Sequence, residues 1–150
     1  MSKRISVGLL VLVLVMISGC LGAVDDEQAI NQTLDKWQNS YRTNEKDFLA
    51  TMTNFVQLSA LVYDSESESE NLYVEFVGTK QSFAFLLTTQ LDIEEIRLED
   101  LEVTRTGNEA VVNATLYWDT DEVYQSLVRL EKHGNKWLFR ELIIVFDRAV

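Results

Sequence analysis

The chain has 150 residues, a formal net charge of −11, no proline and one cysteine. Proteins that bind nucleic acids neutralise phosphates with clustered Lys and Arg side chains, so this acidity argues against a nucleic-acid partner. A lone cysteine excludes an intrachain disulfide, and a hydrophobic core must therefore hold the fold together. The length suits one compact domain.

The first twenty residues combine a basic start, an apolar run and the cysteine. Lys3 and Arg4 precede a charge-free segment at 5–17, and the small pair Ser18-Gly19 stands directly before Cys20. This order resembles a prokaryotic lipoprotein signal, in which a peptidase cuts before the cysteine and the cysteine becomes lipidated.

That resemblance implies a division of the chain into a signal peptide at 1–19, a brief tether at 20–27 and a folded domain at 28–150. Lipidated Cys20 would anchor the protein to the cell membrane. The domain would lie on the extracytoplasmic side, because Lys3 and Arg4 favour the cytoplasm. The alternative is an uncleaved anchor with the same orientation, since the charge-free run at 5–24 has about the length that a bilayer core requires.

Two helices are expected at the start of the domain. The first is predicted by an amphipathic stripe with steps of four, three and four residues, formed by Ile30, Leu34, Trp37 and Tyr41. The second is predicted to begin at Asn44, which suits a helix cap, and to run past Phe48 toward Phe55.

The middle of the chain begins with an acidic run, DSESESE at 64–70. Such a run repels itself and predicts a mobile, solvated loop. It lacks the glycine of a twelve-residue calcium-binding loop, and its glutamates do not have the spacing of that loop's terminal glutamate. The alternation at 72–77 predicts a short strand that ends at Gly78, and the apolar residues from Phe83 to Leu91 predict a third helix.

The part after Glu95 is predicted to be an antiparallel meander. A turn at Gly107-Asn108 would place Val103 opposite Val112 and Leu101 opposite Ala114.

A second turn is predicted at Gly134-Asn135. It would place Leu130 opposite Phe139 and, farther from the turn, Val128 opposite Glu141. In this register Glu141 would share one face of the sheet with four apolar residues, Trp137, Phe139, Ile143 and Val145.

Helices followed by a strongly bent antiparallel sheet indicate an α+β domain. The order helix, helix, strand, helix and meander, with the closing segment VRLEKHGNKWLFRELII at 128–144, resembles the nuclear-transport-factor-2-like family of cone-shaped domains, which includes SnoaL-like members. The resemblance implies a cup between the helices and the concave sheet, which different members use for catalysis, for ligand binding or for assembly.

Five residues are candidates for lining such a cup: Tyr63, Tyr117, Trp118, Tyr124 and Glu141. Aromatic side chains with polar tips suit a partly apolar ligand, although core packing explains them equally well. An apolar wall disfavours a charged carboxylate, so Glu141 would suit a general base or a ligand anchor. The alternative is that Glu141 pairs with Lys132 or Lys136 or points out at the sheet edge.

Other kinds of site find little support. The only histidine, His133, lies beside a predicted turn, and Cys20 is assigned to lipidation, so neither Ser-His-Asp or Cys-His catalysis nor a zinc site is expected. We assign no catalytic residue, metal or cofactor.

Three functions agree with these features. The favoured one is a membrane-anchored, non-catalytic module for ligand binding or for assembly with an envelope protein. The second is a small proton-transfer enzyme of isomerase or dehydratase type, with Glu141 as base and Tyr124 as polariser. The third is a homodimer through the outer sheet face, on which four apolar residues would meet a second copy, Leu127, Leu142, Ile144 and Phe146.

Overall fold

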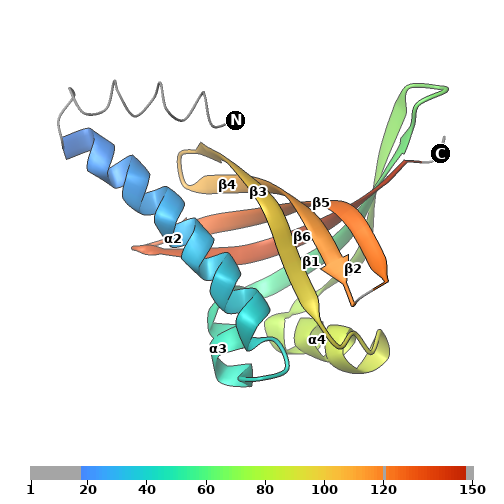
Figure 1. Ribbon diagram of the computed structural model, residues 1–150, viewed down its shortest axis with the longest axis horizontal. Helices are drawn as coiled ribbons and strands as arrows, with labels where there is room; N and C mark the ends of the chain where they lie inside the picture. Colours follow the sequence, from blue (N-terminus) through green and yellow to red (C-terminus); the bar gives the residue numbers. More distant parts are fainter. Residues whose placement is uncertain (1–17, 120, 148–150) are drawn as a thin grey trace.

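The computed structural model describes residues 18–119 and 121–147, so most of the predicted signal segment lies outside the described residues. One long helix and shorter helical turns lie against a bent six-stranded sheet (Figure 1). The elements in chain order are α2 (Ser18–Ser40), α3 (Glu45–Ala50), β1 (Met52–Asp64), β2 (Ser69–Thr79), α4 (Lys80–Phe85), η1 (Leu86–Gln90), β3 (Ile96–Thr106), β4 (Glu109–Trp118), β5 (Glu122–His133) and β6 (Lys136–Asp147). The predicted α+β class is confirmed.

Helix α2 carries three residues of the predicted stripe, Ile30, Leu34 and Trp37, which are fully enclosed. The fourth, Tyr41, directly follows the end of the helix and is also buried. The helix already includes residues 20–27, so this segment is helical and continuous with the domain. Among the described residues, none of the helices has the length and apolar character needed to cross a membrane.

The segment after α3 differs from the prediction. The second helix ends at Ala50, and the chain continues as the thirteen-residue strand β1. We did not predict this strand. Val56 and Leu58 are buried on its inner face, whereas Gln57 and Ser59 point to the outer face. The side chains therefore alternate between the two faces, as in a regular strand. Pairing with β2 on one side and β6 on the other stabilises an extended conformation that local preference alone does not specify.

The acidic run is the turn of a hairpin between β1 and β2, and the strand predicted at 72–77 lies inside β2. The next apolar segment divides into α4 and a π-helical turn, in which the Leu91 amide donates to the Leu86 carbonyl at 2.8 Å. Phe83 and Leu87 are buried as expected, but Leu91 is largely exposed.

The sheet has the strand order β2-β1-β6-β5-β4-β3, with β1 parallel to β6 and all other pairs antiparallel. Both predicted glycine turns are present, with Gly107 at φ +62° and Gly134 at φ +64°. The pairs nearest these turns, Val103 with Val112 and Leu130 with Phe139, are confirmed.

Beyond these pairs, two bulges overturn the predicted registers. Between Glu99 and Glu102 the pairing of β3 with β4 shifts by one residue, at the point where Leu101 was expected opposite Ala114, so the predicted register does not continue toward Ile96. In β6 the pairing with β5 skips Arg140, and Val128 therefore lies opposite Leu142 instead of Glu141. One extra residue reverses the facing of every later side chain in the strand.

The β6 bulge also changes the predicted dimer surface. Leu142 is fully buried in the core, and Ile144 packs against that core, so neither belongs to the outer face. Of the four predicted residues, only Leu127 points outward; its partner there is Ile143. The prediction that these four residues form an outer surface for a second copy is therefore wrong.

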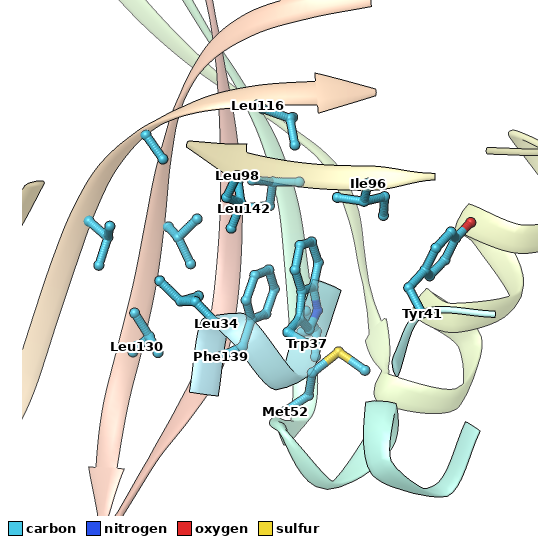
Figure 2. Close-up of a cluster of buried hydrophobic side chains, with 14 of the residues drawn as sticks. Leu34, Trp37, Tyr41, Met52, Ile96, Leu98, Leu116, Leu130, Phe139 and Leu142 are labelled. Carbon is cyan, nitrogen blue, oxygen red and sulfur yellow. The ribbon is translucent and has the colours of Figure 1, made fainter. Parts of the chain in front are cut away.

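The core lies between α2 and the inner face of the sheet (Figure 2). Trp37 stacks on Phe139 with ring centroids 4.6 Å apart and on Phe48 at 5.8 Å. Met52, Leu116, Leu130 and Leu142 fill the surrounding space, each at most 1% exposed.

The N-terminal part of α2 is held to the hairpin ends by Asp26. Its carboxylate accepts a hydrogen bond from the Trp137 indole at 3.1 Å and forms ion pairs with Lys132 at 3.0 Å and Arg105 at 3.4 Å. The bond from Trp137, followed by that from Lys132, lowers the pKa of Asp26.

Asp26→Asn should lower the free energy of unfolding by about 1 kcal/mol at neutral pH, because a partly exposed ionic contact contributes on this scale. A lowered folded-state pKa stabilises the fold above the unfolded value of about 4 and loses that effect as the pH falls through the folded value. The deficit should therefore shrink on acidification. Chemical denaturation between neutral and strongly acidic pH measures it, with Asp35→Asn on the exposed side of the same helix as control. A deficit that does not change with pH would contradict the assigned charge contact.

Candidate functional site

The five predicted cup residues lie on both faces of the sheet. Trp118 is buried in the core and Tyr124 packs against it on the inner face. Tyr117 alternates with Trp118 and points outward, as do Tyr63 and Glu141. The structure therefore does not bring these side chains together around one pocket.

The tyrosines have local partners. The Arg97 guanidinium lies 4.2 Å from the ring centroid of Tyr117. The Tyr124 hydroxyl donates to Glu122 at 2.9 Å, and its ring makes an edge contact with Phe146. Burial, followed by this glutamate, raises the pKa of Tyr124, which keeps the hydroxyl protonated.

Among the described acidic side chains Glu141 is the most buried, at 2% exposure, and it lies within a polar cluster on the outer face. One of its oxygens accepts a hydrogen bond from Arg129 at 2.8 Å. The other accepts from Ser59 at 2.6 Å and from Gln57 at 2.9 Å. The carboxylate in turn raises the pKa of Arg129.

This cluster corrects the prediction for Glu141 in two ways. The acid does not lie in an apolar wall with Trp137 and Phe139, because the bulge at Arg140 turns it to the opposite face. Its cationic partner is Arg129, not Lys132 or Lys136. Gln57 and Ser59 were not foreseen because they belong to β1, whose parallel pairing with β6 has no local sequence signal.

A hollow lies elsewhere, between the end of α2, α3 and α4-η1. It has a volume of about 620 Å³ and is lined by Tyr41, Arg42, Thr43, Glu45, Phe48, Gln81, Ala84, Phe85, Thr88 and Thr89. None of these residues was predicted as a site residue, since they become neighbours only through tertiary packing.

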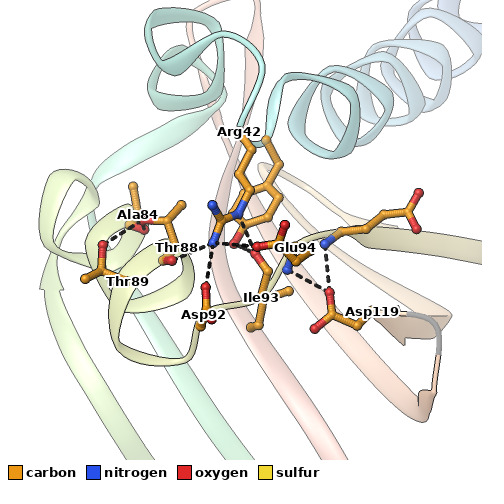
Figure 3. Close-up of polar contacts among 10 residues, drawn as sticks. Arg42, Ala84, Thr88, Thr89, Asp92, Ile93, Glu94 and Asp119 are labelled. Atoms are coloured by element: carbon orange, nitrogen blue, oxygen red, sulfur yellow. Dashed lines mark hydrogen bonds and ion pairs between the residues drawn. The ribbon is translucent and has the colours of Figure 1, made fainter.

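Arg42 holds one side of this hollow together (Figure 3). It follows the end of α2 at φ +64°, a left-handed conformation that turns the chain toward α3. Its guanidinium donates to the Ile93 carbonyl at 2.7 Å and to the Thr88 carbonyl at 2.6 Å, and it lies 3.3 Å from Asp92. Most of its donor capacity is therefore used within the protein.

Two neighbouring residues, Tyr41 and Asp119, also hold the segment around Ile93 in place. The Tyr41 hydroxyl donates to the same Ile93 carbonyl at 2.5 Å, and burial raises the pKa of Tyr41, so the donor keeps its proton. Asp119 accepts the amides of Glu94 and Glu95 at 2.7 and 2.9 Å, which fixes the approach to β3 (Figure 3). The Arg42 side of the hollow is therefore held in place by hydrogen bonds, and the charge of Arg42 is partly neutralised by Asp92.

The remaining candidates are the histidine and a metal site. His133 has a side chain 53% exposed at the β5–β6 turn, 3.1 Å from Glu131. Across the described part of the chain, no three His, Cys, Asp or Glu side chains are close enough together to hold a metal ion.

Comparison with known proteins gives a fold relationship. No family model matches the chain, and no curated protein matches its sequence. Among solved structures, it is similar to an NTF2-like protein of unknown function from Shewanella baltica, with 14% identity, a TM-score of 0.54 and coverage of 81% of this chain and 93% of the other.

Two other structures lead to the same fold. A protein of unknown function with a cystatin-like fold from Nostoc punctiforme has 12% identity, a TM-score of 0.56 and coverage of 83% and 93%. A putative scytalone dehydratase from Novosphingobium aromaticivorans has 12% identity, a TM-score of 0.55 and coverage of 82% and 85%. Identities this low establish architecture and leave activity open. The chain therefore has the nuclear-transport-factor-2-like cone fold.

Proposed function

We propose that this protein is a lipid-anchored extracytoplasmic protein whose domain acts as a non-catalytic module for binding or assembly. The filled space between α2 and the sheet is the main support for the non-catalytic part. Trp37, stacked between Phe139 and Phe48, occupies the region where an enzyme of this fold would need room for a substrate.

The position of Glu141 supports the same conclusion. A general base must reach the proton that it removes. Glu141 faces away from the space between helix and sheet, and both of its oxygens already accept hydrogen bonds from Arg129, Gln57 and Ser59. These contacts suit a structural role in joining β1, β6 and β5.

The anchoring part of the proposal rests on the order of residues before Cys20, with Lys3 and Arg4, the charge-free run and Ser18-Gly19. Helical backbone from Ser18 onward supports a short connection. Asp26, which contacts the sheet, lies six positions after Cys20, and a helix covers this distance in about 9 Å. The domain would then lie close to the membrane surface.

Expression of the full chain in a bacterial host that processes lipoproteins tests the anchor. The wild-type protein should appear in the membrane fraction, incorporate an alkyne-labelled fatty acid and show the mass of a chain that begins at Cys20. Cys20→Ser should lose the label and the cleavage, whereas Ser18→Ala keeps a small residue before the cut and should retain both. An unlabelled wild-type chain of full-length mass in the membrane would instead establish the uncleaved anchor.

Glu141→Gln tests the non-catalytic role. Loss of the charge should weaken the bonds from Arg129 and Ser59 and lower the free energy of unfolding by about 1–3 kcal/mol. The matched control is Glu109→Gln, a largely exposed carboxylate 3.4 Å from the same arginine, for which we expect a change below about 0.5 kcal/mol. Unchanged or increased stability of Glu141→Gln in denaturation experiments would indicate an acid strained for function and would favour the proton-transfer enzyme.

A further inference from the structure

The two edges of the sheet differ in how they face solvent. β3 forms one edge and β2 the other. An edge strand presents backbone donors and acceptors that another strand can pair with, and proteins usually protect such edges with charges, bulges or covering elements. The contrast between these two edges indicates which one is available to a partner.

The β3 edge is protected in three ways. Its amide at Leu98 donates to the Gln38 side chain of α2 at 3.0 Å, so the helix satisfies one edge donor. A bulge with Asp100 at φ +56° interrupts the strand. Charged side chains follow one another along it, namely Arg97, Glu99, Asp100, Glu102 and Arg105.

The β2 edge has the opposite character between Ser69 and Val74. Leu72 and Val74 are each 54% exposed and Tyr73 is 50% exposed. The pairing of Leu72 with Leu61 and of Val74 with Ser59 places both aliphatic side chains on the outer face, and Tyr73 points to the inner face. The bulge near Glu75 ends this six-residue stretch. In Figure 1 the β1–β2 hairpin extends beyond the helices, on the opposite side of the molecule from the start of α2.

We propose that Ser69–Val74 is a docking edge that accepts an extended segment of a basic partner protein as an added β-strand. Backbone pairing would supply affinity, and apolar side chains at alternate positions of the partner would cover Leu72 and Val74. This inference deepens the proposed binding role and rests on it.

Charge decides between a basic partner and a second copy. The docking edge itself contains Glu70 and continues directly into the turn with Glu66 and Glu68, and none of these three glutamates forms an ion pair with another residue of the described chain. A strand that carries Lys or Arg at the end beside this turn would neutralise it. Two copies of a chain with net charge −11 would instead repel each other.

The test uses the protein as purified from membranes in detergent, together with fluorescent peptides of about nine residues that alternate Val and Thr. One peptide carries two lysines at an end, a second carries two glutamates there, and a third has a central proline that interrupts strand pairing. The lysine peptide should bind at least tenfold more tightly than either of the others, and raised salt should weaken it. Binding should also slow amide hydrogen exchange at 69–74.

Leu72→Lys combined with Val74→Lys should weaken binding of the lysine peptide at least tenfold. Val123→Lys is the matched control, since this valine on β5 is also 54% exposed. The control variant should bind the lysine peptide within twofold of the wild-type affinity. Circular dichroism of both variants checks that the fold is intact.

Two outcomes would overturn the proposal. The first is no binding of the lysine peptide at about 1 mM, or binding that the double variant leaves unchanged. The second is a dimer in analytical ultracentrifugation that the double variant dissociates, since this would assign the edge to a second copy. Cys20→Ser should not alter peptide binding, so failure of the anchor and failure of the docking edge can be told apart.

Discussion

One extra residue in β6 sets the arrangement of the whole sheet. The bulge at Arg140 allows Phe139 before it and Leu142 after it to face the same core. Regular alternation would have placed Glu141 in the core and Leu142 outside. Because β6 pairs with both β1 and β5, this one irregularity also determines which of their side chains lie opposite an acid and which lie opposite a leucine.

The bulge and the stacked aromatic rings together place the apolar core on one face of the sheet and the buried acid on the other. The space beneath α2 is occupied by Trp37 and Phe139, so the cone of this fold encloses a packed core. The buried acid lies on the other face and connects three strands through Arg129, Gln57 and Ser59. In this cluster, charged and polar side chains join three strands.

The molecule has two dissimilar ends. At one end, Asp26 fastens the first turns of the described helix to the β3–β4 and β5–β6 hairpins through Arg105, Lys132 and Trp137. At the other, the acidic turn at 64–70 extends away from the helices beside an apolar strand edge (Figure 1). An anchor near Cys20 would therefore leave the acidic hairpin directed away from the attachment point, where a partner can reach it.

The sequence by itself determined the apolar stripe from Ile30 to Tyr41, the glycine turns at 107 and 134, the pairs beside those turns and the α+β class, because these depend on local periodicity and turn chemistry. The cone shape was expected from the resemblance to a known family. Only the tertiary structure decided the strand β1, the facing of Glu141 and the hollow beside Arg42. Parallel pairing of β1 with β6 joins segments about eighty residues apart, as Gln57 and Glu141 illustrate. A bulge inserts one unpaired residue where packing requires it, and neither effect has a signature in neighbouring residues.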